Sequence, residues 1–150
     1  AIQLGLMGKA MDEARAAAER GEVPVGAVLV DARKGVILAA AGNRVEELND
    51  PTAHAEMLVI REAAHTTGTV RLEQCDIYVT LEPCPMCATA ISFARIRRLY
   101  FGAYDPKGGG VDHGPRIYQQ PTCHHKPEVY GGLNEREAGE LLKNFFASRR

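Results

Sequence analysis

The stretch DIYVTLEPCPMCATAISFARIRRLYFGA, residues 76–103, decides the fold. Residues 76–81 alternate apolar side chains in the manner of a buried strand, and two prolines then end that run. Residues 86–94 have the composition of a helix, and residues 99–103 are a second apolar strand. Strand, helix and strand in this order predict a β-α-β unit with parallel strands, so the core is expected to be an α/β sheet.

Upstream of this unit, the sequence predicts one helix and a hairpin. Apolar residues recur at helical spacing from Leu4 to Ala18, and Gly21 follows as a stop signal. Residues 23–30 and 36–41 are dense in apolar and β-branched side chains, and the polar link 31–35 between them ends in glycine. These two runs are expected to pair as the strands of a hairpin.

A second helix is predicted to begin within Asn49-Asp50-Pro51-Thr52. Asp50 or Thr52 has the side chain of a helix cap, and Pro51 suits a first turn. This helix is expected to run to about His65 and to stop near Gly68.

The C-terminal third predicts one short strand and a final helix. Residues 108–110 are all glycine and begin an irregular segment, and 128–131 is a candidate last strand. The final helix is expected to bury four side chains, Leu141, Leu142, Phe145 and Phe146. With 150 residues and 45% hydrophobic content, the chain is expected to form one domain over 1–150.

Composition narrows the class of protein and its compartment. No apolar run approaches the roughly 20 residues that cross a bilayer, and the N-terminal residues lack the pattern of an export signal, so neither a membrane partner nor secretion is expected. The four cysteines, Cys75, Cys84, Cys87 and Cys123, then favour metal or thiol chemistry in a reducing cytoplasm over a disulfide framework.

Charge is unevenly distributed along a chain whose net charge is only -1. Residues 1–94 carry 8 Lys/Arg against 13 Asp/Glu, whereas residues 95–150 carry 10 against 6. This basic excess fits either a solvated face or a surface that contacts phosphates, with Lys107 as a candidate contact. Its other prominent members are Arg95, Arg97, Arg98, Lys126 and the closing Arg149-Arg150.

Two short clusters carry the chemistry. His54-Ala55-Glu56 lies at the expected start of one helix, and Pro83-Cys84-Pro85-Met86-Cys87 joins a strand to the next helix. Helix starts of this kind converge beyond the carboxyl ends of the strands in an α/β sheet, so the clusters are expected to share one pocket. A positive helix end also favours thiolates at the two cysteines.

The residue types predict a catalytic zinc site. His54, Cys84 and Cys87 would give one Zn²⁺ three protein ligands, and a tetrahedral ion then keeps a fourth position for water. Zinc lowers the pKa of such a water from about 16 toward about 7, which makes hydroxide available at neutral pH. Glu56 is the candidate that takes the proton and passes protons to the substrate and its leaving amine.

Two considerations oppose this assignment. Residues two apart on a regular helix point about 200° apart, so spacing alone does not aim both His54 and Glu56 at one metal. The alternative function class is a zinc-stabilised binding module with a closed structural site, in which Glu56 has no use. Its fourth ligand would come from Cys75, Cys123, His65, His113, His124 or His125.

The combined pattern, H-x-E followed by P-C-x-x-C, resembles the cytidine and deoxycytidylate deaminase superfamily. Within it the chain is similar to the bacterial tRNA-specific adenosine deaminases nearly end to end. The similarity is carried by 22–27 (EVPVGA), 42–44 (GNR), 50–56 (DPTAHAE), 78–84 (YVTLEPC) and 101–103 (FGA), with 141–146 (LLKNFF) also alike.

The resemblance implies a three-layer α/β/α cytidine-deaminase-like domain with a central mixed five-stranded sheet. It also implies a homodimer with one Zn²⁺ per subunit, which converts the wobble adenosine of a tRNA anticodon loop to inosine and releases ammonia. The alternative substrate is a free base or nucleoside, such as guanine, cytosine or cytidine, because the same zinc chemistry serves those compounds.

The resemblance also implies substrate contacts. Asn43 is similar to a family residue that binds the base, although a turn asparagine is the alternative reading of this residue. Residues 105–110, DPKGGG, depart from the Lys-Thr-Gly-like run of better-known members. The remaining implied contacts are Val25, Gly26 and Ala27 against the purine, and Asp105 and His125 near the RNA.

Overall fold

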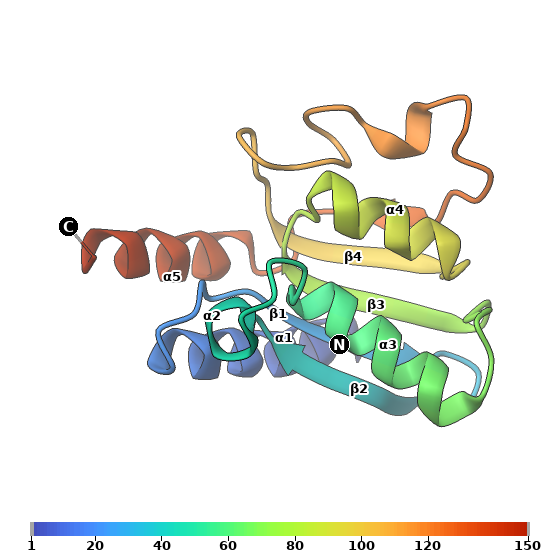
Figure 1. Ribbon diagram of the computed structural model, residues 1–150, viewed down its shortest axis with the longest axis horizontal. Coiled ribbons are helices and arrows are strands. Elements are labelled where there is room, and N and C mark those ends of the chain that lie inside the picture. The colour runs from blue at the N-terminus through green and yellow to red at the C-terminus, as the bar shows by residue number, and fades with distance from the viewer. Residues whose placement is uncertain (1, 150) are drawn as a thin grey trace.

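The computed structural model describes residues 2–149 and contains the expected mixed five-stranded sheet (Figure 1). The strand order is β2-β1-β3-β4-β5, with β3 antiparallel to β1 and parallel to β4. Arg150, at the end of the basic excess, lies outside the described residues. The strands are β1 (Gly26–Asp31), β2 (Val36–Gly42), β3 (Cys75–Leu81), β4 (Arg98–Ala103) and β5 (Glu128–Tyr130).

Helices cover both faces of the sheet, which confirms the three-layer architecture. Figure 1 shows α3 (Ala55–Thr67) and α4 (Pro85–Phe93) in front of the sheet, with α1 (Ile2–Glu19) behind it. The last helix, α5 (Glu135–Ala147), contacts α1, β3 and β4 on the rear face. No helix within residues 2–149 has both the length and the apolar character needed to span a bilayer.

The β-α-β unit forms as its sequence predicts. β3 and β4 pair in parallel, with Ile77 opposite Leu99, and α4 connects them. The hairpin of β1 and β2 also forms, and Asp31 closes its turn by accepting backbone N-H groups of Arg33 and Lys34. All five strands therefore have the expected places, within a few residues of the predicted bounds.

The core extends over both faces of the sheet. On the front face, Val59 of α3 and Ile91 of α4 belong to the cluster that buries the apolar side chains of β1, β3 and β4. On the rear face, Met7 of α1 packs with Tyr78 and Tyr100, whose rings stack with centroids 4.4 Å apart. Burial on both faces explains why Ile77, Tyr78 and Val79 of β3 are all buried although their side chains point to alternate faces.

Glycine brings α1 directly against the sheet. A Cβ at Gly42 would lie 2.6 Å from the carbonyl oxygen of Glu13, and one at Gly26 would overlap the backbone of α1 at Ala10. Only glycine allows so close an approach. Gly26, expected at the substrate pocket, is therefore also required by helix packing on the opposite face.

Three local predictions were wrong. The second helix begins at Ala55 rather than within 49–52, because Asp50 instead forms a turn by accepting the N-H and hydroxyl of Thr52. The final helix was expected to bury four side chains, but Phe146 of α5 is 49% exposed, and Leu141, Leu142 and Phe145 are only partly buried. The short helices α2 (Val45–Leu48) and η1 (Ile117–Gln119) were not predicted.

Candidate active site

The two predicted clusters meet at one end of the sheet. His54 is the residue before α3, and Cys84 is the residue before α4. Both residues line a single pocket together with Leu81, the last residue of β3. The carboxyl end of a central strand thus brings together two helix starts, as expected for an α/β sheet.

The backbone conformation at His54 explains how the two side chains of the H-x-E pair can reach the same pocket. His54 has φ -74° and ψ 151°, which is extended backbone, whereas Glu56 is the second residue of the helix. The opposition of residues two apart holds only within a helix, so it does not apply here. Both side chains accordingly line the pocket.

The three predicted ligands have the spacing of a zinc site. The Nδ1 atom of His54 lies 3.6 Å from Sγ of Cys84 and 3.5 Å from Sγ of Cys87. With Zn-S bonds of about 2.3 Å and Zn-N bonds of about 2.0 Å, a tetrahedral ion separates its sulfur and nitrogen ligands by about 3.6 Å. The donor set and its spacing therefore fit one zinc ion, held through Nδ1 rather than Nε2.

No fourth protein ligand joins this group within residues 2–149. Three of the six alternative donors are engaged elsewhere: Nδ1 of His113 bonds to Glu82, Nε2 of His125 bonds to the Ile96 carbonyl, and Cys75 is buried beside β1. Three protein ligands with an open position are the catalytic pattern of zinc, not the closed structural one.

Hydrogen bonds within the ligand cluster shift the pKa values of the two cysteines in opposite directions. Hydrogen bonding with Cys87 lowers the pKa of Cys84 to about 4 against the effect of burial, and His54 contributes to the same shift. Its bond with Cys84, together with burial, raises the pKa of Cys87 far above its usual range. The pKa of His54 is raised, first by its hydrogen bond with Cys84. Paired thiolate and thiol are a ligand set that loses one further proton when a metal binds.

Glu56 is a buried carboxyl group at the floor of the pocket, with only 4% of its surface exposed. Burial raises the pKa of Glu56 to about 7. A group with such a pKa gains and loses a proton readily near neutrality, as a general acid-base catalyst requires.

Asn43 joins the pocket to the start of α3. Its Oδ1 accepts the backbone N-H of Ala55 at 2.8 Å, although the sequence offered Asp50 and Thr52 as nearer candidates for a helix cap. A backbone N-H can only donate, so the oxygen of the amide must face it. The amide nitrogen of Asn43 is then left as a donor for a molecule in the pocket.

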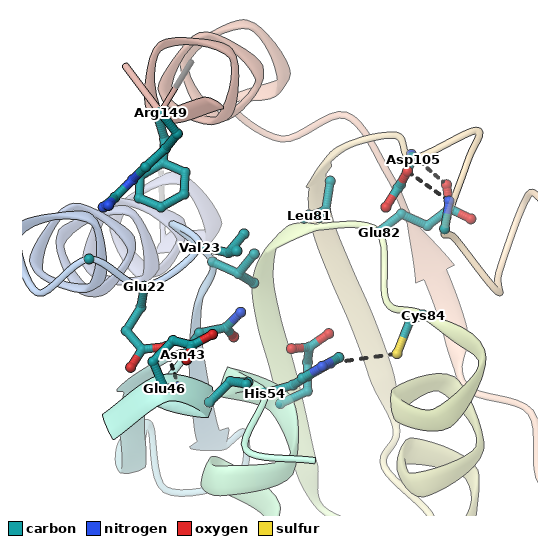
Figure 2. A pocket seen from close by; sticks show the side chains of 16 residues that line it. Glu22, Val23, Asn43, Glu46, His54, Leu81, Glu82, Cys84, Asp105 and Arg149 are labelled. Carbon is teal, nitrogen blue, oxygen red and sulfur yellow. Dashed lines mark hydrogen bonds between the residues drawn. The ribbon is translucent and has the colours of Figure 1, made fainter. Parts of the chain in front are cut away.

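The pocket has a volume of about 690 Å³ and is walled by several elements (Figure 2). Glu22 and Val23 form one side and Glu82 and Asp105 the other, while Arg149 of the C-terminal segment lies at the upper left in this view, above Glu22 and Val23. Such a volume lies within the range of small-molecule sites.

The structure brings most of the predicted substrate residues to this pocket, but not all. Val25, Asn43 and Asp105 line it. Gly26 and Ala27 follow Val25 inside β1 and are buried, and Lys107 is exposed on the loop beyond Asp105. His125 lies away from the pocket, in a second cavity beside α4.

Several lining residues were not predicted from the sequence. Glu22 is buried and accepts the backbone N-H groups of Glu46 and Glu47, which start α2. Phe145 and Arg149 line the pocket from α5 and the residues after it, with the guanidinium carbon 4.5 Å from the ring centroid. An acidic residue directly before an apolar strand is a feature of the sequence that could have indicated Glu22. Nothing in the neighbouring sequence indicated Phe145 or Arg149.

Comparisons with known proteins agree with this geometry. Residues 3–103 match the family described as the cytidine and deoxycytidylate deaminase zinc-binding region. A tRNA-specific adenosine deaminase from Agrobacterium fabrum is 61% identical over 141 residues, covering 94% of this chain and 91% of the relative.

Solved structures give the same grouping. One, from a study of A-to-I editing by tRNA:A34 deaminases at the wobble position of transfer RNA, has a TM-score of 0.89 at 61% identity and covers 92% of this chain and 99% of its own. Guanine deaminase from Bacillus subtilis is more distant, with a TM-score of 0.65 at 31% identity over 97% of this chain and 92% of its own. The chain belongs to the cytidine and deoxycytidylate deaminase family and, within it, to the tRNA-specific adenosine deaminases.

Proposed function

We propose that this protein hydrolyses the wobble adenosine of a tRNA anticodon to inosine and releases ammonia. The observation that carries the proposal is the three-ligand cluster with an open position beside the buried Glu56. A binding module has no use for a buried carboxyl group beside an incomplete coordination shell. The 61% identity to a tRNA-specific adenosine deaminase, against 31% to a guanine deaminase, favours RNA over a free base.

The residues of the pocket divide the reaction between them. A zinc ion bound by His54, Cys84 and Cys87 would supply a water of lowered pKa. Glu56 accepts a proton from the attacking water and gives it to N1 of the adenine ring, and then accepts the proton of the new hydroxyl on C6 and gives it to the departing amine. The new bond joins the water oxygen to C6, and the bond from C6 to the amine breaks, so one water enters and one ammonia leaves.

The base is oriented by the walls of the pocket. Val25 packs against the purine, with Gly26 and Ala27 behind it in β1. Asn43 donates its amide N-H to the ring. A base must leave its stack to reach this depth, as in other enzymes that act on a nucleobase.

The flanking nucleotides contact the rim. Asp105 and Lys107 lie on the loop that borders one side, and Arg149 borders the other. His125 lines the second cavity rather than the substrate pocket, so its proposed contact with RNA is at the surface beside that cavity. Cationic contacts of this type give a binding affinity that falls steeply as salt rises.

We propose in addition that the protein is a homodimer that acts in the cytoplasm. Phe93 of α4 is 79% exposed and borders the second cavity, of about 380 Å³. A large aromatic side chain beside a cavity is typical of a surface that a partner covers.

Light scattering should give twice the mass of one chain, and Phe93→Asp should give monomers. Val70→Asp is the matched control and should remain dimeric, because Val70 is 75% exposed on the loop between α3 and β3. A wild-type mass of one chain at all concentrations would contradict this assignment.

The decisive experiment compares substrates on the zinc-loaded protein. An anticodon stem-loop with adenosine at the wobble position should yield inosine, detected after nuclease digestion and chromatography. The same stem-loop with guanosine at that position is the matched control and should not react. Turnover of free guanine, cytosine or cytidine without turnover of the RNA would sink the proposal.

A further inference from the structure

Glu82 is a buried acid that the proposed reaction does not use. Its side chain is fully buried, although the residue follows β3 and lies only two positions before Cys84. The carboxylate of Glu82 makes five hydrogen bonds, and all five join it to residues 105–113. This carboxylate is therefore the centre of a connection between β3 and one loop of the pocket rim.

The five bonds use both oxygens of the carboxylate. Oε2 accepts the backbone N-H groups of Val111, Asp112 and His113 at 2.9 to 3.1 Å. Oε1 accepts the N-H of Asp105 at 3.0 Å and bonds to Nδ1 of His113 at 2.8 Å. Every neighbour of this buried carboxylate donates a hydrogen bond to it. The NH₂ group of a glutamine amide would face one of these donors, so a glutamine cannot make the same set of bonds.

The glycines of the DPKGGG run permit this arrangement. A Cβ at Gly109 would overlap the Glu82 carboxylate, and a Cβ at Gly110 would lie 2.6 Å from Cα of Pro85, next to Cys84. The N-H of Gly110 also bonds to the Pro83 carbonyl at 2.8 Å. The departure from the usual Lys-Thr-Gly-like run thus fits a loop that packs directly on Glu82 and on the turn before α4.

The loop reaches the substrate pocket at its other side. Asp105 and Gly108 line the pocket, and Asp105 Oδ1 accepts the N-H groups of Lys107 and Gly108 at 3.2 and 2.9 Å. The loop is thus held at Glu82 on its inner side and presents its outer side to whatever enters the pocket.

We propose that Glu82 is a positioning residue for the substrate, which holds the 105–113 loop in the shape that binds the nucleotides beside the target base. This inference rests on the proposed function for its substrate, but not for its geometry. Loss of the carboxylate should loosen the loop and weaken binding of RNA, while His54, Glu56 and the two ligand cysteines keep their places.

The test uses the zinc-loaded protein with the wobble-adenosine stem-loop. Glu82→Gln should raise KM at least tenfold while kcat falls less than threefold and zinc stays at one per chain, because the lost contacts serve binding rather than chemistry. Hydrogen exchange at the amides of 105 and 111–113 should accelerate at least tenfold. Glu62→Gln, which makes the same change at an exposed position of α3 outside the pocket lining, should change none of these quantities.

A second variant tests the contact from the opposite side and guards against misfolding of the first. Gly109→Ala should displace the carboxylate and reproduce the rise in KM and the faster exchange. Gly8→Ala in α1, where a Cβ meets nothing within 4 Å, is its control and should behave as wild type. Unchanged hydrogen exchange at residues 111–113 in both Glu82→Gln and Gly109→Ala would overturn the inference. A fall in kcat and zinc content at unchanged KM would also overturn it. If the wild type does not act on the RNA, the proposed function fails, and the exchange rates still decide whether Glu82 holds the loop.

Discussion

Asn43 caps a helix that begins twelve residues after it, because its Oδ1 accepts the backbone N-H of Ala55 at 2.8 Å. The same residue lines the pocket and is buried. One side chain thus connects the position of His54 and Glu56, at the start of α3, to the amide donor that we propose for the substrate. Stability and substrate binding should therefore respond differently to different substitutions at this position.

We expect Asn43→Ala to lower the free energy of unfolding by about 1 kcal/mol, since it removes the cap, and to lower kcat/KM as well. Asn43→Asp keeps an oxygen for the Ala55 N-H and puts a negative charge at a helix start, which is favourable. It should therefore retain stability but lose the amide donor, and kcat/KM should fall at least tenfold. Urea denaturation and steady-state kinetics on both variants test this. Wild-type kinetics in Asn43→Asp would show that the amide donates nothing to the substrate.

Local pattern was sufficient to predict most of the fold. The run from 76 to 103 forms the β-α-β unit because its strands are apolar on both faces and its helix begins directly after Pro83 and Cys84. The start of α3 was mispredicted because Asp50 has the chemistry of a cap but uses it within its own turn. The true cap, Asn43, is distant in sequence and could not be recognised from spacing.

The sequence indicated some residues of the candidate site, whereas others could be found only from the structure. Ligand types and their spacing indicated His54, Cys84 and Cys87, because zinc chemistry itself constrains them. Phe145 and Arg149 line the pocket only because α5 folds against α1, β3 and β4, and no short motif encodes that packing.

Glu56→Gln should separate turnover from metal binding. The amide has the size of the carboxyl group but cannot accept the proton, so kcat should fall at least hundredfold. Zinc content, measured by atomic emission, should stay at one per chain. Cys84→Ala, which removes a ligand, is the contrasting variant and should lose the metal together with the activity. Equal turnover in wild type and Glu56→Gln would remove Glu56 from the chemistry and support the zinc-stabilised module.

Cys75 should resist alkylation across the neutral and mildly alkaline range. Burial raises the pKa of its thiol from the ordinary 9.0 to about 11, with Asp31 and Asp76 acting in the same direction. A raised pKa keeps the thiol protonated, so at pH 9 only about 1% is the reactive thiolate. Mass spectrometry of the zinc-loaded protein after iodoacetamide treatment at pH 7 to 9 should find Cys75 unmodified. Cys123, which is only partly buried, is the internal comparison, and unfolding in urea should abolish the protection. Rapid modification of native Cys75 at pH 7 would contradict its assigned environment.

Arg149 should bind RNA through charge alone. Its guanidinium lies over the Phe145 ring at the rim of the pocket, where we expect it to contact a phosphate rather than a base edge. We expect Arg149→Ala to weaken binding of the stem-loop by about threefold to tenfold and to reduce the slope of log K against log salt by about 1. Arg33→Ala removes the same charge from the exposed turn between β1 and β2, outside the pocket, and should leave the slope unchanged. Fluorescence anisotropy over a series of salt concentrations measures both variants. Equal slopes in wild type and Arg149→Ala would show that the phosphates pass over another part of the rim.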